Sequence, residues 1–147
     1  MLPTLALSLT LLLSPACATG KQAQRTDQKE SANLGARSED FWNNLRWQYP
    51  AAAAGAIEDE LARRRWGIEA ERLMGAQRIT DAMLINLSLD PTPEEGARTA
   101  TVQVRMEFYT LPDQVLRKET VTQTWYRGKN TWYLQWEDGH PLTGEDW

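Results

Sequence analysis

Residues 99–108 read Thr-Ala-Thr-Val-Gln-Val-Arg-Met-Glu-Phe, in which small or apolar residues alternate with polar ones. Successive side chains of a β-strand point to opposite faces, so this stretch predicts a strand with one buried face and one wet face. Glu107 belongs to the wet face and is expected to meet solvent. The inward set is Ala100, Val102, Val104, Met106 and Phe108.

The same alternation continues on both sides of this stretch. Turn-forming residues at 90–96, 111–114 and 127–130 separate the runs, which predict four strands over residues 79–89, 100–108, 115–126 and 131–136. Connections this short favour an antiparallel meander. In the first strand the expected inward residues are Ile79, Met83, Ile85, Leu87 and Leu89.

Helical spacing replaces the alternation upstream of residue 76. Phe41, Trp42, Leu45 and Tyr49 predict an amphipathic helix over residues 39–49, with Ser38 as its N-cap. A short second helix is expected from Pro50 to Ala54, and a third over residues 59–74 that ends at Gly75. The fold class predicted is α+β, with N-terminal helices packed on a curved four-stranded antiparallel sheet.

The beginning of the chain is typical of an exported protein. Residues 1–16, MLPTLALSLTLLLSPA, are uncharged and apolar, too short to span a bilayer, and end in small residues, which predicts a signal peptide. Residues 18–38 hold one large apolar residue, Leu34, and predict a flexible tether about 25 Å in typical extent. Residues 39–147 then form the globular domain.

The segment Leu13-Ser14-Pro15-Ala16-Cys17 resembles the lipobox of bacterial lipoproteins. The resemblance implies that Cys17, the single cysteine, is acylated with fatty acids such as palmitate and becomes the new N-terminus. Two departures are Ser14, where the family usually has leucine, and the absence of a basic residue before the apolar run. An ordinary secretory signal is the alternative. Ala18 after the cysteine implies delivery to the outer membrane, with the domain facing the periplasm.

The order of elements, with Asn44-Leu45-Arg46-Trp47 running into the alanines of residues 51–54, resembles small lipoprotein domains of the nuclear transport factor two-like superfamily over residues 39–138. These cone-shaped α+β folds also include ketosteroid isomerase and scytalone dehydratase. Related cones often dimerise through the outer face of the sheet, so the resemblance allows for a homodimer of this chain.

Catalytic chemistry has little support in the residues. Enzymes on this cone use a buried carboxylate as a base, and Asp81 is an acidic residue within an otherwise apolar row. His140 is expected in a surface loop. One histidine and one acylated cysteine give no metal-binding spacing, so neither metal nor cofactor is predicted, and the net charge of -4 argues against nucleic acid.

A set of large side chains can either line a pocket or fill a closed core. Its members are Trp66, Asp81, Met106, Gln123 and Trp125. Gln123 favours the pocket, since an inward amide needs a hydrogen-bond partner. Two functions follow as hypotheses: a non-enzymatic envelope lipoprotein that binds a partner protein or a small apolar ligand, and a small lyase or isomerase with Asp81 as base.

Overall fold

The computed structural model of the chain describes residues 18–90 and 98–145. The signal peptide, Cys17 and most of the turn expected at residues 90–96 lie outside this part. The elements in chain order are α1 (Ala18–Arg46), α2 (Pro50–Ala53), the 3-10 turn η1 (Ala54–Ala56), α3 (Glu60–Ala76), β1 (Gln77–Leu89), β2 (Thr99–Thr110), β3 (Leu116–Arg127) and β4 (Trp132–Leu134).

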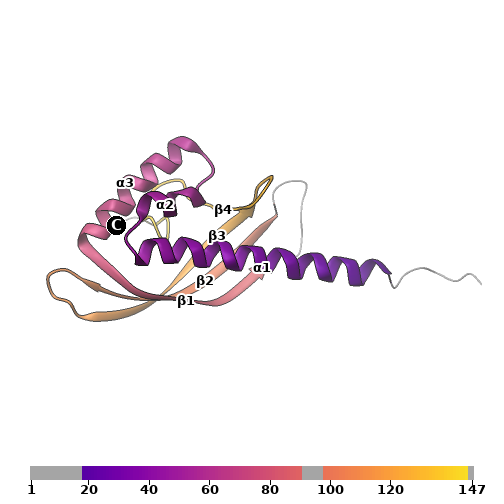
Figure 1. The fold of residues 1–147 in the computed structure, drawn as a ribbon, viewed down its shortest axis with the longest axis horizontal. Coiled ribbons are helices and arrows are strands. Elements are labelled where there is room, and N and C mark those ends of the chain that lie inside the picture. The colour runs from indigo at the N-terminus through magenta and orange to yellow at the C-terminus, as the bar shows by residue number, and fades with distance from the viewer. Residues whose placement is uncertain (1–17, 91–97, 146–147) are drawn as a thin grey trace, which may run out of the picture.

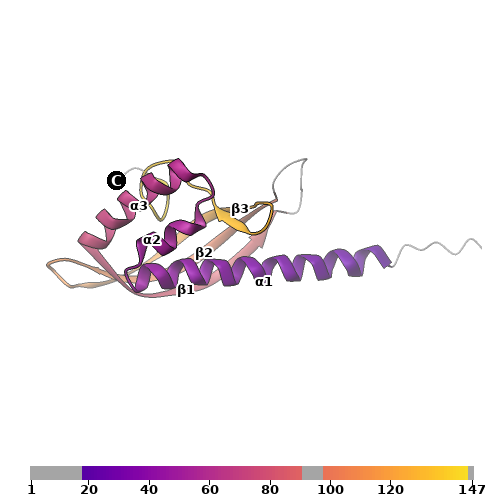
Figure 2. The same cartoon turned by 45° about the horizontal axis from the view of Figure 1, so that its top comes forward.

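The fold is α+β, as predicted. The four strands form one antiparallel sheet in the order β1-β2-β3-β4, and the helices pack on one of its faces (Figures 1 and 2). The hairpin that joins β2 to β3 projects past α3 at one end of the molecule, while α1 extends beyond the sheet at the other end. The sheet thus has one face covered by helices and one face open to solvent.

The prediction of a flexible tether over residues 18–38 is wrong, because α1 is one helix that spans this segment and the helix expected at residues 39–49. Its 29 residues correspond to a length of about 43 Å. The segment contains no proline and many strong helix formers, so its polarity hid a helix that composition alone does not exclude. Ser38, expected as an N-cap, lies buried within the helix.

Contacts with the distant strands hold α1 in place. The Glu30 carboxylate accepts hydrogen bonds from Arg127 Nε at 2.9 Å and from Trp132 Nε1 at 3.0 Å. Leu34, one turn further along, is fully buried. Residues 20–29 of α1 are exposed, and the buried residues of this helix lie from Leu34 onward.

The two shorter helices, α2 and α3, lie close to where the sequence predicted them. Pro50 begins α2 as expected, and Asp59 caps α3 by accepting a hydrogen bond from the backbone N–H of Ala62 at 2.8 Å. Gly75, expected to end α3, lies within its last turn. No helix in the described ranges combines the length and the apolar character that crossing a membrane requires.

Two β-bulges in β1 change which of its residues face the core. The register with β2 shifts at residues 79–81 and again at 84–86. Met83 and Ile85, expected to point inward, are 48% and 46% exposed, so this part of the prediction is wrong. Each extra residue moves the alternation by one position. The residues of β1 that pack on the core are Ile79, Ala82, Leu84, Leu87 and Leu89.

Candidate functional site

The aromatic residues expected to line a pocket lie together in a closed core. Phe41 of α1 lies between Trp66 and Trp125, with ring centroids 5.6 and 5.9 Å from its own. Both tryptophans are fully buried and Met106 is 2% exposed. The Trp66 indole donates a 2.8 Å hydrogen bond to the Pro141 carbonyl. These side chains fill the space between helices and sheet.

Asp81 lies apart from this group. It directly follows the first β-bulge and pairs in register with Glu107, whose carboxylate forms a 2.7 Å ion pair with Lys118 on the open face of the sheet. Glu107 therefore lies on the wet face, as predicted. Asp81 is half-buried on the open face of the sheet and does not enter an enclosed pocket.

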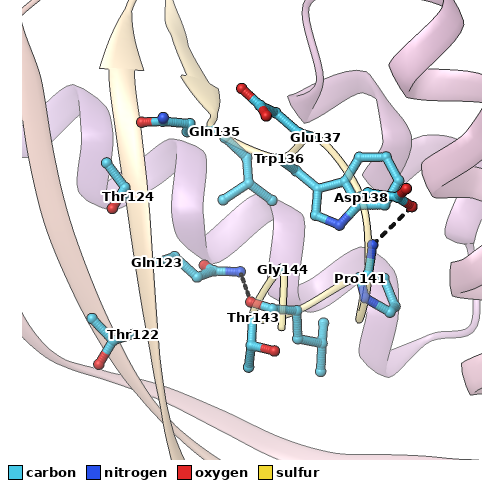
Figure 3. Close-up of a pocket in the computed structure, with 13 residues that line it drawn as sticks. Thr122, Gln123, Thr124, Gln135, Trp136, Glu137, Asp138, Pro141, Thr143 and Gly144 are labelled. Atoms are coloured by element: carbon cyan, nitrogen blue, oxygen red, sulfur yellow. Dashed lines mark hydrogen bonds between the residues drawn. The ribbon is translucent and has the colours of Figure 1, made fainter. Parts of the chain in front are cut away.

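Gln123 lines a cavity of about 460 Å³ at the other end of the sheet, where the chain leaves β4 and loops back across β3 (Figure 3). The cavity lies between residues 122–124 of β3 and the C-terminal segment, residues 137–144. Its lining consists of Thr122, Gln123, Thr124, Leu134, Gln135, Trp136, Glu137, Asp138, Gly139, Pro141, Leu142, Thr143 and Gly144.

The amide of Gln123 is half satisfied. Its Nε2 donates a hydrogen bond to the Leu142 carbonyl at 3.3 Å (dashed in Figure 3), whereas its buried Oε1 accepts none. The side chain is 3% exposed, and an unsatisfied buried acceptor costs about 1–3 kcal/mol. The amide points inward, as the sequence predicted. Its N–H group has an acceptor, but its carbonyl oxygen has no donor.

The C-terminal segment is held in a defined loop. His140 N–H donates to the Glu145 carbonyl at 2.6 Å, and the His140 carbonyl accepts from Gly144 N–H at 2.7 Å. Gly139 has a φ of 84°, and a Cβ there would approach the Glu145 carbonyl oxygen to 2.5 Å. Only glycine fits this position, so the backbone conformation of this wall of the cavity is fixed.

The electrostatic character of the cavity is acidic. Glu137 and Asp138 belong to its lining, and no lysine or arginine does. Burial lowers the pKa of His140, with Glu119 and Glu145 acting in the opposite direction. A lowered pKa keeps the imidazole neutral near pH 7, and its Nδ1 accepts a hydrogen bond from the Leu142 N–H at 3.2 Å.

An uncovered strand edge leads into the cavity. β4 pairs only with residues 125–127 of β3, and the last backbone bond on that edge joins Gln135 N–H to the Thr124 carbonyl at 2.8 Å. From Leu116 to Thr122, β3 therefore pairs with β2 alone, and the side chains of residues 116–120 are all exposed. Cavity and edge form one continuous surface.

Sequence reasoning found Gln123 but missed the residues around it. Glu137 and Asp138 follow the last strand in a segment that carries no recognisable motif, and Gly139 is the one local signal of a fixed turn. Within residues 18–90 and 98–145, no three His, Cys, Asp or Glu side chains gather as metal ligands. Comparison with family models and with curated proteins finds no match to this chain.

Proposed function

We propose that this chain is a non-enzymatic lipoprotein of the cell envelope whose domain binds a partner protein at the β3 edge and its cavity. The observation that carries the proposal is the exposed length of β3 from Leu116 to Thr122, which ends at a polar cavity. An unpaired strand presents a row of backbone donors and acceptors, and natural proteins usually shield such an edge unless a partner uses it.

A partner protein fits this surface better than a small apolar ligand does. The closed core around Phe41 offers an apolar ligand no room, and the cavity is lined mainly by hydroxyl, amide and carboxylate side chains. The lyase hypothesis is less well supported, because Asp81 belongs to the open face of the sheet near the Glu107–Lys118 ion pair.

The anchor at Cys17 completes the proposal. Cys17 immediately precedes α1, so acylation there would attach the membrane to a helix rather than to a loose tether. Two or more acyl chains give stable anchoring, whereas one gives only reversible binding. The β3 edge would then face the periplasm, with α1 as the spacer from the outer membrane.

The anchor is tested by labelling cells with a radioactive or alkyne-tagged fatty acid. The wild type should incorporate label and sediment with membranes, and Cys17→Ala should do neither. Absence of label in the wild type would refute the anchor.

Partner binding is tested by in-cell photocrosslinking from Thr120 on the β3 edge, with Glu71 on the exposed face of α3 as the control position. A single adduct of fixed mass is expected from residue 120 and not from residue 71. Equal patterns from both positions would show that the edge has no dedicated partner.

A further inference from the structure

The residues of β3 whose backbone groups point outward indicate how a partner would be held. Because N–H and C=O groups of alternate residues point to the same side of a strand, the Thr124 carbonyl that bonds Gln135 identifies the outward set. Every second residue before Thr124 therefore directs its backbone N–H and C=O groups to the uncovered side; these are Thr122, Thr120 and Lys118. Seven residues from 116 to 122 provide an edge about 23 Å long.

The other boundaries of the sheet differ from the β3 edge. β1, at the opposite edge, packs against α1, and β4 is only three residues long. The β3 edge joins a free backbone row to a cavity that holds two carboxylates, and at its far end the hairpin carries exposed apolar side chains. These are Leu111, Val115 and Leu116, which are 41%, 57% and 55% exposed.

The charges next to the edge argue against a second copy of this chain as the occupant. Antiparallel pairing about a two-fold axis at Glu119 would place Glu119 opposite itself, and an axis at Lys118 would do the same for Lys118. Like charges directly opposite each other are destabilising. An axis at Thr120 limits the pairing to residues 118–122, because Gln135 already occupies the edge at Thr124.

The cavity favours a cationic side chain. Its lining holds the Glu137 and Asp138 carboxylates without any basic residue, and the Gln123 Oε1 is an acceptor with no donor. A lysine or arginine brings N–H donors and a positive charge that complements the two carboxylates. Arg65, whose guanidinium lies 6.0 Å from the Trp136 ring centroid, is not part of the lining.

We propose that the β3 edge takes an extended segment of a different protein as an added antiparallel strand, and that a lysine or arginine near the start of this segment enters the cavity. This inference rests on the proposed function and names the chemistry of its partner. β4 runs antiparallel to β3, so a strand that continues its row begins beside the cavity and ends at the apolar hairpin. Backbone bonds supply the affinity, and the cation supplies the specificity.

The probes are three acetylated, C-terminally fluorescein-labelled peptides, X-Val-Thr-Val-Thr-Val-Thr, in which X is lysine, norleucine or glutamate. Fluorescence anisotropy with the full chain should show the lysine peptide binding about 10-fold more tightly than the norleucine peptide, with the glutamate peptide weakest. The double variant Glu137→Gln/Asp138→Asn should remove this preference. Equal binding of the three peptides, or binding of none at millimolar concentration, would overturn the proposal.

Proline at residue 120 tests the added strand separately. Thr120→Pro removes one outward N–H, which an edge strand tolerates, whereas Thr120→Ala keeps it. Binding of the lysine peptide should be lost in the first variant and retained in the second, with unchanged circular dichroism in both. Equal binding by the two variants would show that no strand is added.

The same pair of variants separates this inference from the proposed function. If crosslinks from Thr122 to a cellular protein persist in Thr120→Pro, a partner docks but not as a strand. If the peptides bind as expected and no cellular crosslink forms, the strand chemistry stands and the proposed function fails.

Discussion

Replacing Glu30 with alanine removes the carboxylate that joins the middle of α1 to the sheet. Trp132, which is 1% exposed, loses the acceptor of its indole N–H, and a buried donor without a partner costs about 1–3 kcal/mol. The partly exposed ion pair with Arg127 adds about 0.2–1 kcal/mol. The free energy of unfolding should therefore fall by about 1–4 kcal/mol.

Two measurements check this expectation. Urea denaturation gives the free energy of unfolding, and amide hydrogen exchange reports on residues 18–33. These should exchange faster in the variant because α1 has lost its Glu30 contacts, with the Asp27–Arg98 ion pair remaining. Gln28→Ala is the matched control, since Gln28 is an exposed neighbour in the same helix.

A loss below about 0.5 kcal/mol, with exchange of residues 18–33 unchanged, would refute the reasoning. It would mean that α1 is held by its buried side chains and by the Asp27–Arg98 ion pair rather than by the Glu30 contacts.

Three further outcomes follow from the core and the titrating groups. Phe41→Ala should lower the free energy of unfolding by about 3–5 kcal/mol and weaken the near-UV circular dichroism of the tryptophans that it contacts. Burial lowers the pKa of His140, so stability should be full above the ordinary value near 6.5 and decrease as the pH falls below it; denaturation between pH 5 and 7.5 should show a smaller decrease for His140→Asn, whose side-chain oxygen can still accept from Leu142. Burial, with the Glu58 hydrogen bond, raises the pKa of Tyr126 to about 12. Its stabilising contribution should therefore be lost between pH 10 and 12, and ultraviolet titration of Tyr126→Phe should lack the ionisation near pH 12.

The alternation in residues 99–108 and the helical spacing around Phe41 and Trp66 were sufficient to predict the α+β class, the meander and most of the buried side chains. These features depend on the local period of apolar residues, which is a property of the chain alone. The start of α2 at its proline and the start of α3 at its cap residue also depend only on neighbouring residues.

The order of α1 was decided by contacts that the local sequence does not contain. The mostly polar pattern of residues 18–38 indicated a tether, yet Glu30 bonds to strand residues 97 and 102 positions later and Leu34 is buried in the core. A helix whose stability comes from such contacts cannot be recognised by its own periodicity.

Tertiary structure also decided the site. The bulges that place Asp81 on the open face arise from the register with β2, and the cavity exists because the chain leaves the β3 edge after Gln135 and returns at Leu142. The sequence by itself determined that Gln123 would point inward. Which groups surround that amide depended on the path of the C-terminal segment, because nonlocal packing brings residues 122–124 and 137–144 together.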